Sequence, residues 1–165
     1  MGLSLASLEV GGGWLAISPM PGRGGAYAAD LADVLAFGPA LVLTMTTPGE
    51  LAAKGAAGLG ADLAARGIGW RALPIADFGV PGPEVLALWP GVAEEVRAVL
   101  AGGGRVLVHC MGGCGRSGMA VLRLMVEAGE PPGAALARLR AVRPCAVETE
   151  AQFAWAAGSA GSAGA

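Results

Sequence analysis

The chain has 165 residues, which is enough for one domain with a hydrophobic core, and its formal net charge is −2. The slightly negative net charge argues against a basic surface that would bind nucleic acid or an anionic membrane. No apolar run reaches the roughly 18 residues that a membrane-spanning helix needs. A single histidine rules out metal sites built from clustered histidines, and Cys110 and Cys114 are too few ligands for a structural zinc site, so we expect no metal and no cofactor. The cysteines follow no disulfide spacing, and no lysine or arginine precedes Arg23, so we expect a cytoplasmic protein without a secretory signal.

Short apolar stretches and helical patterns alternate along the first half of the chain. Residues 5–10 and 14–18 flank three glycines and predict a β-hairpin. Arg23, in the loop that follows, is either a cation that faces a ligand or a solvated loop residue. The later patterns predict, in order, a helix over residues 28–37, a strand over 40–45, a helix that opens with a capping box of Thr47 and Glu50, a helix over 59–66 and a strand over 70–74.

The second half of the chain continues the same alternation. Residues 84–100 have helical periodicity, although Pro90 should break or kink this helix. The remaining patterns predict, in order, a strand over residues 106–108, a helix over 116–128, a helix over 131–143 and a helix over 147–157. We therefore predict an α/β fold with a central, mostly parallel sheet of four to five strands flanked by helices. Residues 1–157 are expected to form a single domain, followed by a flexible C-terminal tail over residues 158–165.

The segment VLVHCMGGCGRSG, over residues 106–118, combines a buried strand, a glycine-rich turn and a helix N-terminus. Such a turn directs successive backbone N–H groups into one concavity at the positive end of a helix dipole, so it can bind an anion. Arg116 adds a planar fork that suits two phosphate oxygens. Cys110 lies at the end of the strand, where the dipole and Arg116 would hold it as thiolate, and a thiolate beneath a bound phosphate can attack phosphorus. The alternative is an inert buried cysteine, which Arg116 and the glycines disfavour.

The pattern from His109 to Ser117, HCx5RS, resembles the signature loop of cysteine-based protein tyrosine and dual-specificity phosphatases. Residues 46–51 and 73–81 are similar to segments of the dual-specificity branch, and residues 143–152 resemble a segment of cell-cycle-type and cyclin-kinase-associated phosphatases. The resemblance covers residues 13–156 and implies a dual-specificity-phosphatase-like fold. The alanine- and glycine-rich composition is typical of a high-GC genome, so we expect a bacterial source.

The resemblance implies a role for each residue of the loop. Cys110 is the expected nucleophile, which forms a cysteinyl-phosphate intermediate, and Ser117 is expected to donate its hydroxyl to the departing thiolate, besides capping the helix. His109 is expected to hydrogen-bond the backbone near Cys110 and not to act as its base, because neighbouring strand residues face opposite ways. The phosphoryl group is expected to bind to the Arg116 fork and to the backbone amides of Met111, Gly112, Gly113, Cys114 and Gly115.

Two candidate residues lie outside the loop. Asp77 matches the general acid that protonates the leaving group, and we expect Phe78 and Val80 to desolvate its carboxyl group partly. The alternative for Asp77 is a turn-stabilising role. In the related enzymes, a glutamine at the position of Gln152 helps to position the hydrolytic water. The alternative for Gln152 is an exposed helix residue.

Two cysteines depart from the family pattern. Cys114 stands where the family more often has an aliphatic residue or lysine, and Cys145 stands where it usually has glycine. Either thiol could trap oxidised Cys110 as a disulfide and protect it from over-oxidation. The alternative, which we favour for both, is a small side chain that fills a gap in the packing.

We predict a phosphoprotein phosphatase that hydrolyses phosphotyrosine, phosphoserine or phosphothreonine, without nucleic-acid or membrane partners and as a monomer. Phosphoinositide phosphatases of this class tend to carry lysine in the loop, whereas Met111, Gly113 and Cys114 are uncharged. One alternative is a thiol-dependent sulfurtransferase or arsenate reductase that uses the same anion loop, but neither needs an acid at Asp77. Another is a phosphoprotein-binding module without activity, which the intact Cys110 and Arg116 disfavour.

Overall fold

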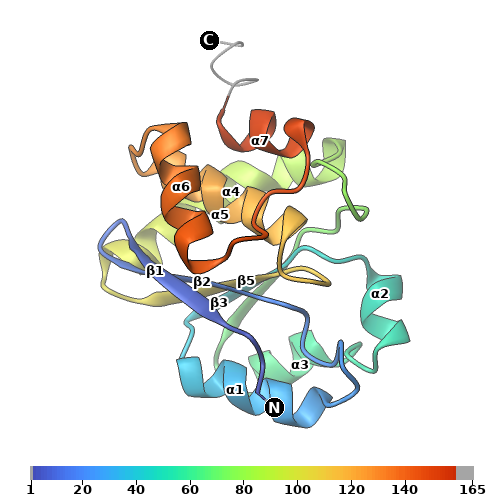
Figure 1. Cartoon of the computed structure of the whole chain (residues 1–165). Coiled ribbons are helices and arrows are strands. Elements are labelled where there is room, and N and C mark those ends of the chain that lie inside the picture. The colour runs from blue at the N-terminus through green and yellow to red at the C-terminus, as the bar shows by residue number, and fades with distance from the viewer. Residues whose placement is uncertain (1, 159–165) are drawn as a thin grey trace.

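A five-stranded sheet forms the middle layer of the molecule, and helices cover both of its faces (Figure 1). The structure is a computed structural model that describes residues 2–158. The hairpin of the first two strands is antiparallel, and the other three pairings are parallel, which confirms the predicted α/β fold. The sheet order is β1-β2-β5-β3-β4, and the strands are β1 (Ala6–Val10), β2 (Gly13–Ser18), β3 (Leu41–Thr44), β4 (Gly69–Ala72) and β5 (Arg105–His109).

One face of the sheet is covered by α1 (Tyr27–Phe37), α2 (Pro48–Ala53) and α3 (Leu59–Ala64); in Figure 1, α1 and α3 lie below the strands and α2 lies to their right. The central strand β5 contributes to both layers, because successive strand residues face opposite ways. Leu107 packs with the core of this face, whereas Val106 and Val108 pack with the core of the other. The continuous apolar run of β5 is therefore the sequence of a strand buried on both sides.

The other face is covered by α4 (Pro83–Ala101), α5 (Gly115–Glu127), α6 (Pro132–Val142) and α7 (Glu150–Ala156). The prediction that Pro90 breaks a helix is wrong, because α4 continues through this residue. Trp89, Val92 and Val96 are buried in the core, and this packing outweighs the one backbone hydrogen bond that a proline removes. α5 is buried along most of its length, as its apolar sequence predicts.

The last helix begins later than the periodicity predicts. α7 starts at Glu150, three residues after position 147, because the Thr149 hydroxyl accepts the Gln152 N–H and caps the helix there. Val147 has a φ of +67°, a left-handed conformation that a helix cannot contain. The predicted tail falls, apart from Gly158, outside the described residues.

The parallel strands set the position of the site. Their carboxyl ends share one edge of the sheet, so the chain segments that follow β2, β3, β4 and β5 meet there. Within residues 2–158, none of the helices combines the length and the apolar character that crossing a membrane requires.

Candidate active site

The turn between β5 and α5 is the loop that the sequence pattern predicts, and it fits closely against the end of β2. Gly113 has a φ of +72°, and a Cβ atom there would lie 2.5 Å from the carbonyl carbon of Ser18 and 2.6 Å from the nitrogen of Pro19. A side chain at this position would therefore push the loop away from the sheet. The Met20 N–H also donates to the Met111 carbonyl oxygen at 3.1 Å, so the segment after β2 and the loop are joined.

The Arg116 guanidinium is buried and leaves one edge open. Nη1 donates to Glu50 Oε1 at 2.7 Å and to the Ile75 carbonyl oxygen at 2.8 Å, and Nη2 donates to Glu50 Oε2 at 3.0 Å. Nε is buried without a hydrogen-bond partner among the described residues. The open donors are therefore Nε–H and the second Nη2–H, which lie along the same edge of the guanidinium plane. Two oxygens of one phosphate fit such an edge.

Glu50 binds Arg116, a role that its place in the predicted capping box does not indicate. The capping box is present: Thr47 Oγ1 accepts the Glu50 N–H at 3.3 Å, and Glu50 Oε1 accepts the Thr47 N–H at 2.9 Å. The same carboxylate holds the Arg116 fork, whose hydrogen bond lowers the pKa of Glu50 despite partial burial. Its partner lies 66 residues away in the chain, so local sequence carries no signal of the pairing.

Cys110 and Ser117 lie together at the base of the loop. Cys110 Sγ and Ser117 Oγ are 3.1 Å apart, and the two side chains are 2% and 0% exposed. Cys110 is the free cysteine of the chain. A hydroxyl at this distance can donate a hydrogen bond to a thiolate.

Asp77 lies in the loop that follows β4, over the open edge of Arg116. Its Oδ1 is 3.4 Å from Arg116 Nη2 and accepts the Phe78 N–H at 3.0 Å. The expectation that Phe78 and Val80 desolvate this carboxyl group is wrong, because Asp77 is 58% exposed and both apolar side chains face solvent. Phe78 has a φ of +62°, and this left-handed residue turns the chain directly after Asp77. The acid is therefore held by backbone geometry beside Arg116 and remains open to solvent.

His109 is buried and bonds to a neighbouring strand. Its Nε2 lies 2.7 Å from Thr44 Oγ1, which also accepts the Trp70 Nε1–H at 2.7 Å. The ring also interacts with the backbone of Cys110, as predicted, although no partner of Nδ1 among the described residues meets strict hydrogen-bond geometry. Burial lowers the pKa of His109 to about 4, although the hydrogen bond to the Cys110 backbone raises it, so the ring is neutral at pH 7.

Arg143, at the end of α6, holds the loop through its carbonyl oxygens, a role that the sequence pattern does not predict. Nε donates to the Gly113 carbonyl oxygen at 2.9 Å and Nη2 donates to that of Gly112 at 3.0 Å, so these peptide groups are fixed with their N–H sides free for a ligand. Burial lowers the pKa of Arg143, the Cys110 sulfur opposes this shift, and Arg23 adds to it. Arg143 is thus close to the nucleophile candidate and to a second cation.

Gln152 links α7 to the acid loop. Its Nε2 donates to the Gly79 carbonyl oxygen at 3.1 Å, and its Oε1 accepts the Glu148 N–H at 2.9 Å. The side chain is 0% exposed, so the alternative of an exposed helix residue is wrong. One Nε2–H remains for another acceptor.

Cys114 and Cys145 form a disulfide with a Cα–Cα distance of 5.1 Å. The expectation that both fill gaps is wrong, and neither pairs with Cys110. The segment after α6 folds back on the loop, where the Val147 N–H donates to the Cys114 carbonyl oxygen at 3.1 Å, and this brings the two thiols together. A cytoplasmic location was expected in part from unpaired cysteines, and the disulfide removes that part of the argument.

The structure thus brings Cys110, Arg116, Ser117 and Asp77 to one place at the carboxyl edge of the sheet. The described residues contain no cluster of three or more side chains that could hold a metal ion. A buried sulfur, a glycine-rich loop at a helix N-terminus, a guanidinium edge and a nearby carboxyl group can bind a tetrahedral anion and exchange a proton with its substituent.

Comparisons with known proteins agree with this geometry. A family model described as cyclin-dependent kinase inhibitor 3 (CDKN3) matches residues 27–135. The active form of the phosphatase Tk-PTP is 30% identical, with 90% of this chain and 91% of that chain covered and a TM-score of 0.68.

Two more distant structures share the fold. Kinase associated phosphatase (KAP), with its catalytic-site cysteine replaced by serine, is 24% identical over 100% of this chain and 98% of that chain, with a TM-score of 0.84. A protein tyrosine phosphatase from Leishmania major is 19% identical over 95% and 98% of the two chains, with a TM-score of 0.72. The phosphatase class that the sequence resembles is therefore confirmed: the chain belongs to the cyclin-dependent kinase inhibitor 3 (CDKN3) family, within the protein tyrosine and dual-specificity phosphatases.

Proposed function

We propose that this phosphatase hydrolyses phosphorylated side chains of proteins through a cysteinyl-phosphate intermediate on Cys110. The observation that carries the proposal is one edge of Arg116 beside the Cys110 sulfur: its Nε–H is buried without a partner among the described residues, and the adjoining Nη2 has only Asp77 Oδ1, at 3.4 Å, besides Glu50. A buried donor without a partner is costly, and an incoming phosphate would satisfy it.

In the first step the Cys110 thiolate attacks phosphorus, an S–P bond forms and the P–O bond to the side chain breaks. The Arg116 edge and the amides of residues 111–116 bind the three equatorial oxygens, whose charge is held most tightly in the transition state. Asp77 enters this step protonated and gives its proton to the leaving oxygen, which departs as an alcohol or phenol. Its position supports this role, because Oδ1 lies 3.4 Å from Arg116 Nη2 and so near the phosphate that this guanidinium would bind.

In the second step a water molecule attacks phosphorus and the S–P bond breaks. The Asp77 carboxylate now accepts the water proton, and Cys110 leaves as thiolate. The Ser117 hydroxyl, 3.1 Å from the sulfur, donates to this thiolate and makes it a better leaving group. We assign Gln152 to the positioning of the water through its free Nε2–H, in line with the resemblance.

The substrate class follows from the charges of the loop. Met111, Gly113 and Cys114 place no cation around the phosphate, which favours a singly phosphorylated group within a protein over a phosphoinositide. We propose that the catalytic domain spans residues 1–157, functions as a monomer in the cytoplasm and needs no cofactor. A sulfurtransferase or arsenate reductase gains no support from the comparisons, which match phosphatases.

Hydrolysis of para-nitrophenyl phosphate by paired cysteine variants tests the proposal. Cys110→Ser should abolish turnover, because an alcohol at this position is not ionised at neutral pH. Cys145→Ser breaks the Cys114–Cys145 disulfide but keeps the nucleophile, so it controls for the replacement of a cysteine by serine as such. Turnover by Cys110→Ser close to that of the wild type would overturn the mechanism.

A further inference from the structure

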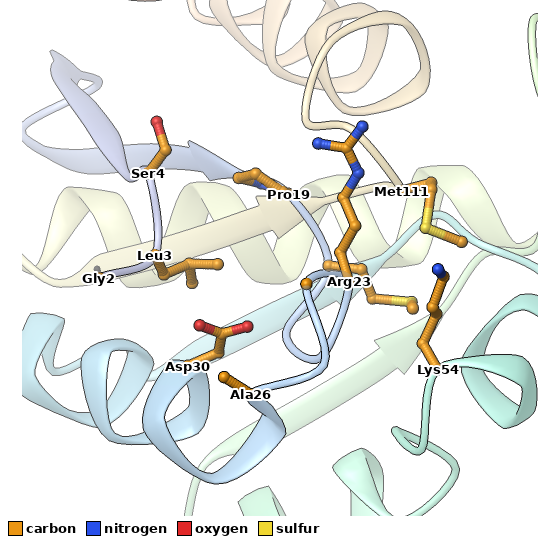
Figure 2. Close-up of a pocket in the computed structure, with 11 residues that line it drawn as sticks. Gly2, Leu3, Ser4, Pro19, Arg23, Ala26, Asp30, Lys54 and Met111 are labelled. Carbon is orange, nitrogen blue, oxygen red and sulfur yellow. The ribbon is translucent and has the colours of Figure 1, made fainter.

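A cavity lies beside the phosphate-binding loop. Its volume is about 910 Å³, and Met111 forms its border with the loop (Figure 2). Pro19 and Met20 line it from the segment after β2, and Leu3 and Ala26 add further apolar surface. Apart from the Met111 amide, none of these residues has a role in the reaction steps above.

The cavity is fixed to the catalytic loop by backbone contacts. Met20 and Met111 share a backbone hydrogen bond, and the close approach of Gly113 to Pro19 leaves no room for a side chain between them. A phosphorylated residue seated over Cys110 therefore holds its flanking chain at a fixed distance from this cavity. The apolar lining can contact that chain, but it does not favour acidic over basic side chains in it.

The charge of the cavity is positive, although the whole chain carries −2. Arg23 and Lys54 line it, and neither forms an ion pair or a side-chain hydrogen bond in the described part of the chain. Figure 2 shows both side chains extending in the same direction, toward the end of the cavity where Met111 lies. Asp30 is the acid of the lining, but it is 8% exposed and its Oδ2 accepts the Gly22 N–H at 2.8 Å.

Arg23 also acts electrostatically on a second cation, Arg143, which supports the phosphate-binding loop. It lies close enough to Arg143 to lower the pKa of that residue further than burial alone does. Two like charges at short distance repel each other, and a bound anion between or beside them removes that cost. The open fork of Arg23 and the ammonium group of Lys54 are thus both available to an anion that enters this cavity.

We propose that this cavity is a recognition subsite for an acidic side chain, aspartate or glutamate, that flanks the phosphorylated residue of the substrate. Arg23 and Lys54 bind the carboxylate, and Met20 and Met111 contact the apolar part of the flanking chain. This inference rests on the proposed function and names the substrates that the site prefers. Of the two alternatives given for Arg23, a ligand-facing cation or a solvated loop residue, the proposal adopts the first.

Two phosphopeptides test the subsite, one with glutamate and one with glutamine on both sides of the same phosphoresidue. The wild type should show a higher kcat/KM for the glutamate peptide, by about two- to fivefold for each exposed cation that the carboxylate meets. The double variant Arg23→Gln, Lys54→Gln should lose this ratio. The matched control Arg66→Gln, Arg105→Gln removes two exposed charges elsewhere on the surface and should keep it.

The outcomes separate this inference from the proposed function. Equal rates for the two peptides with wild type, or an unchanged ratio in the double variant, would overturn the subsite while the phosphatase mechanism stands. A wild type that hydrolyses para-nitrophenyl phosphate but neither peptide would overturn both. A soluble inositol phosphate that competes more strongly than the glutamate peptide would overturn the assignment to a protein substrate.

Discussion

Replacing Glu50 by glutamine tests whether this residue holds Arg116 in its working orientation. Glu50 accepts two charge-assisted hydrogen bonds from Arg116, at 2.7 and 3.0 Å, and the side chains of Arg116 and Glu50 are 1% and 23% exposed. Hydrogen bonds to charged groups contribute about 1.5–3 kcal/mol each, and glutamine keeps one neutral acceptor. We therefore expect Glu50→Gln to lower the free energy of unfolding by about 2 kcal/mol. Because Arg116 would then be less well oriented toward the phosphate, kcat/KM should fall by about 30-fold, which corresponds to a loss of about 2 kcal/mol of transition-state binding.

Glu95→Gln is the matched control. Glu95 also binds an arginine with two hydrogen bonds, from Arg71 at 2.9 and 2.6 Å, but these side chains are 37% and 43% exposed and lie outside the site. An exposed pair contributes about 0–1 kcal/mol, so this variant should keep its activity. Urea unfolding and para-nitrophenyl phosphate kinetics on both variants measure the two effects. If Glu50→Gln matched Glu95→Gln in both measurements, the reasoning would be refuted.

The pH dependence of stability gives an independent test of the same pair. The hydrogen bond from Arg116 holds the pKa of Glu50 below its ordinary value of 4.5. A group with a lowered pKa in the folded state stabilises the fold fully above its unfolded value, and this contribution is lost as the pH falls through the folded pKa. The difference in unfolding free energy between wild type and Glu50→Gln should thus be largest near neutral pH and should shrink as the pH falls below 4.5. A difference that stays constant down to acid pH would contradict the ion pair.

Three further predictions follow from the site and the disulfide. Asp77→Ala should lower turnover of a substrate with a poor leaving group by roughly 10²–10⁴-fold and affect para-nitrophenyl phosphate less; equal losses on both would refute the general-acid role. Arg116→Lys should lose most activity in the same assay, because an ammonium group has no second donor edge, and near-normal turnover would contradict the two-oxygen contact. The Cys114–Cys145 disulfide closes a loop with a separation of 31 residues, so reduction should lower the free energy of unfolding by ~3–4 kcal/mol in urea, with no such effect of reductant on Cys145→Ala.

The sequence predicts those parts of the site whose signal is local. The loop from Cys110 to Ser117 is recognisable because strand, glycines and helix N-terminus follow each other directly, and Asp77 is recognisable from its own short segment. Glu50 and Arg143 do not reveal their roles, because each meets the loop only after folding, across separations of 66 and about 30 residues. The disulfide is hidden for the same reason, since the fold and not the spacing brings Cys114 to Cys145.

Element boundaries show the same division between local and tertiary effects. The capping box of Thr47 and Glu50 forms as predicted, because all of its hydrogen bonds lie within four residues. Pro90 is a strong local signal that misleads, because the buried neighbours Trp89 and Val92 keep α4 continuous. The exposure of the loop that carries Asp77 also depends on tertiary structure. Asp77 and Phe78 both face solvent, so the desolvation expected from their adjacency in the sequence does not occur.

The most direct test of the proposed mechanism is the identification of the phosphorylated residue during turnover. Asp77→Ala, mixed with para-nitrophenyl phosphate and quenched in acid within the first turnover, can be digested and examined by mass spectrometry. The mechanism predicts a phosphoryl group on the peptide that carries Cys110, and none when Cys110 is also replaced by serine. A phosphoryl group on a different residue would contradict it.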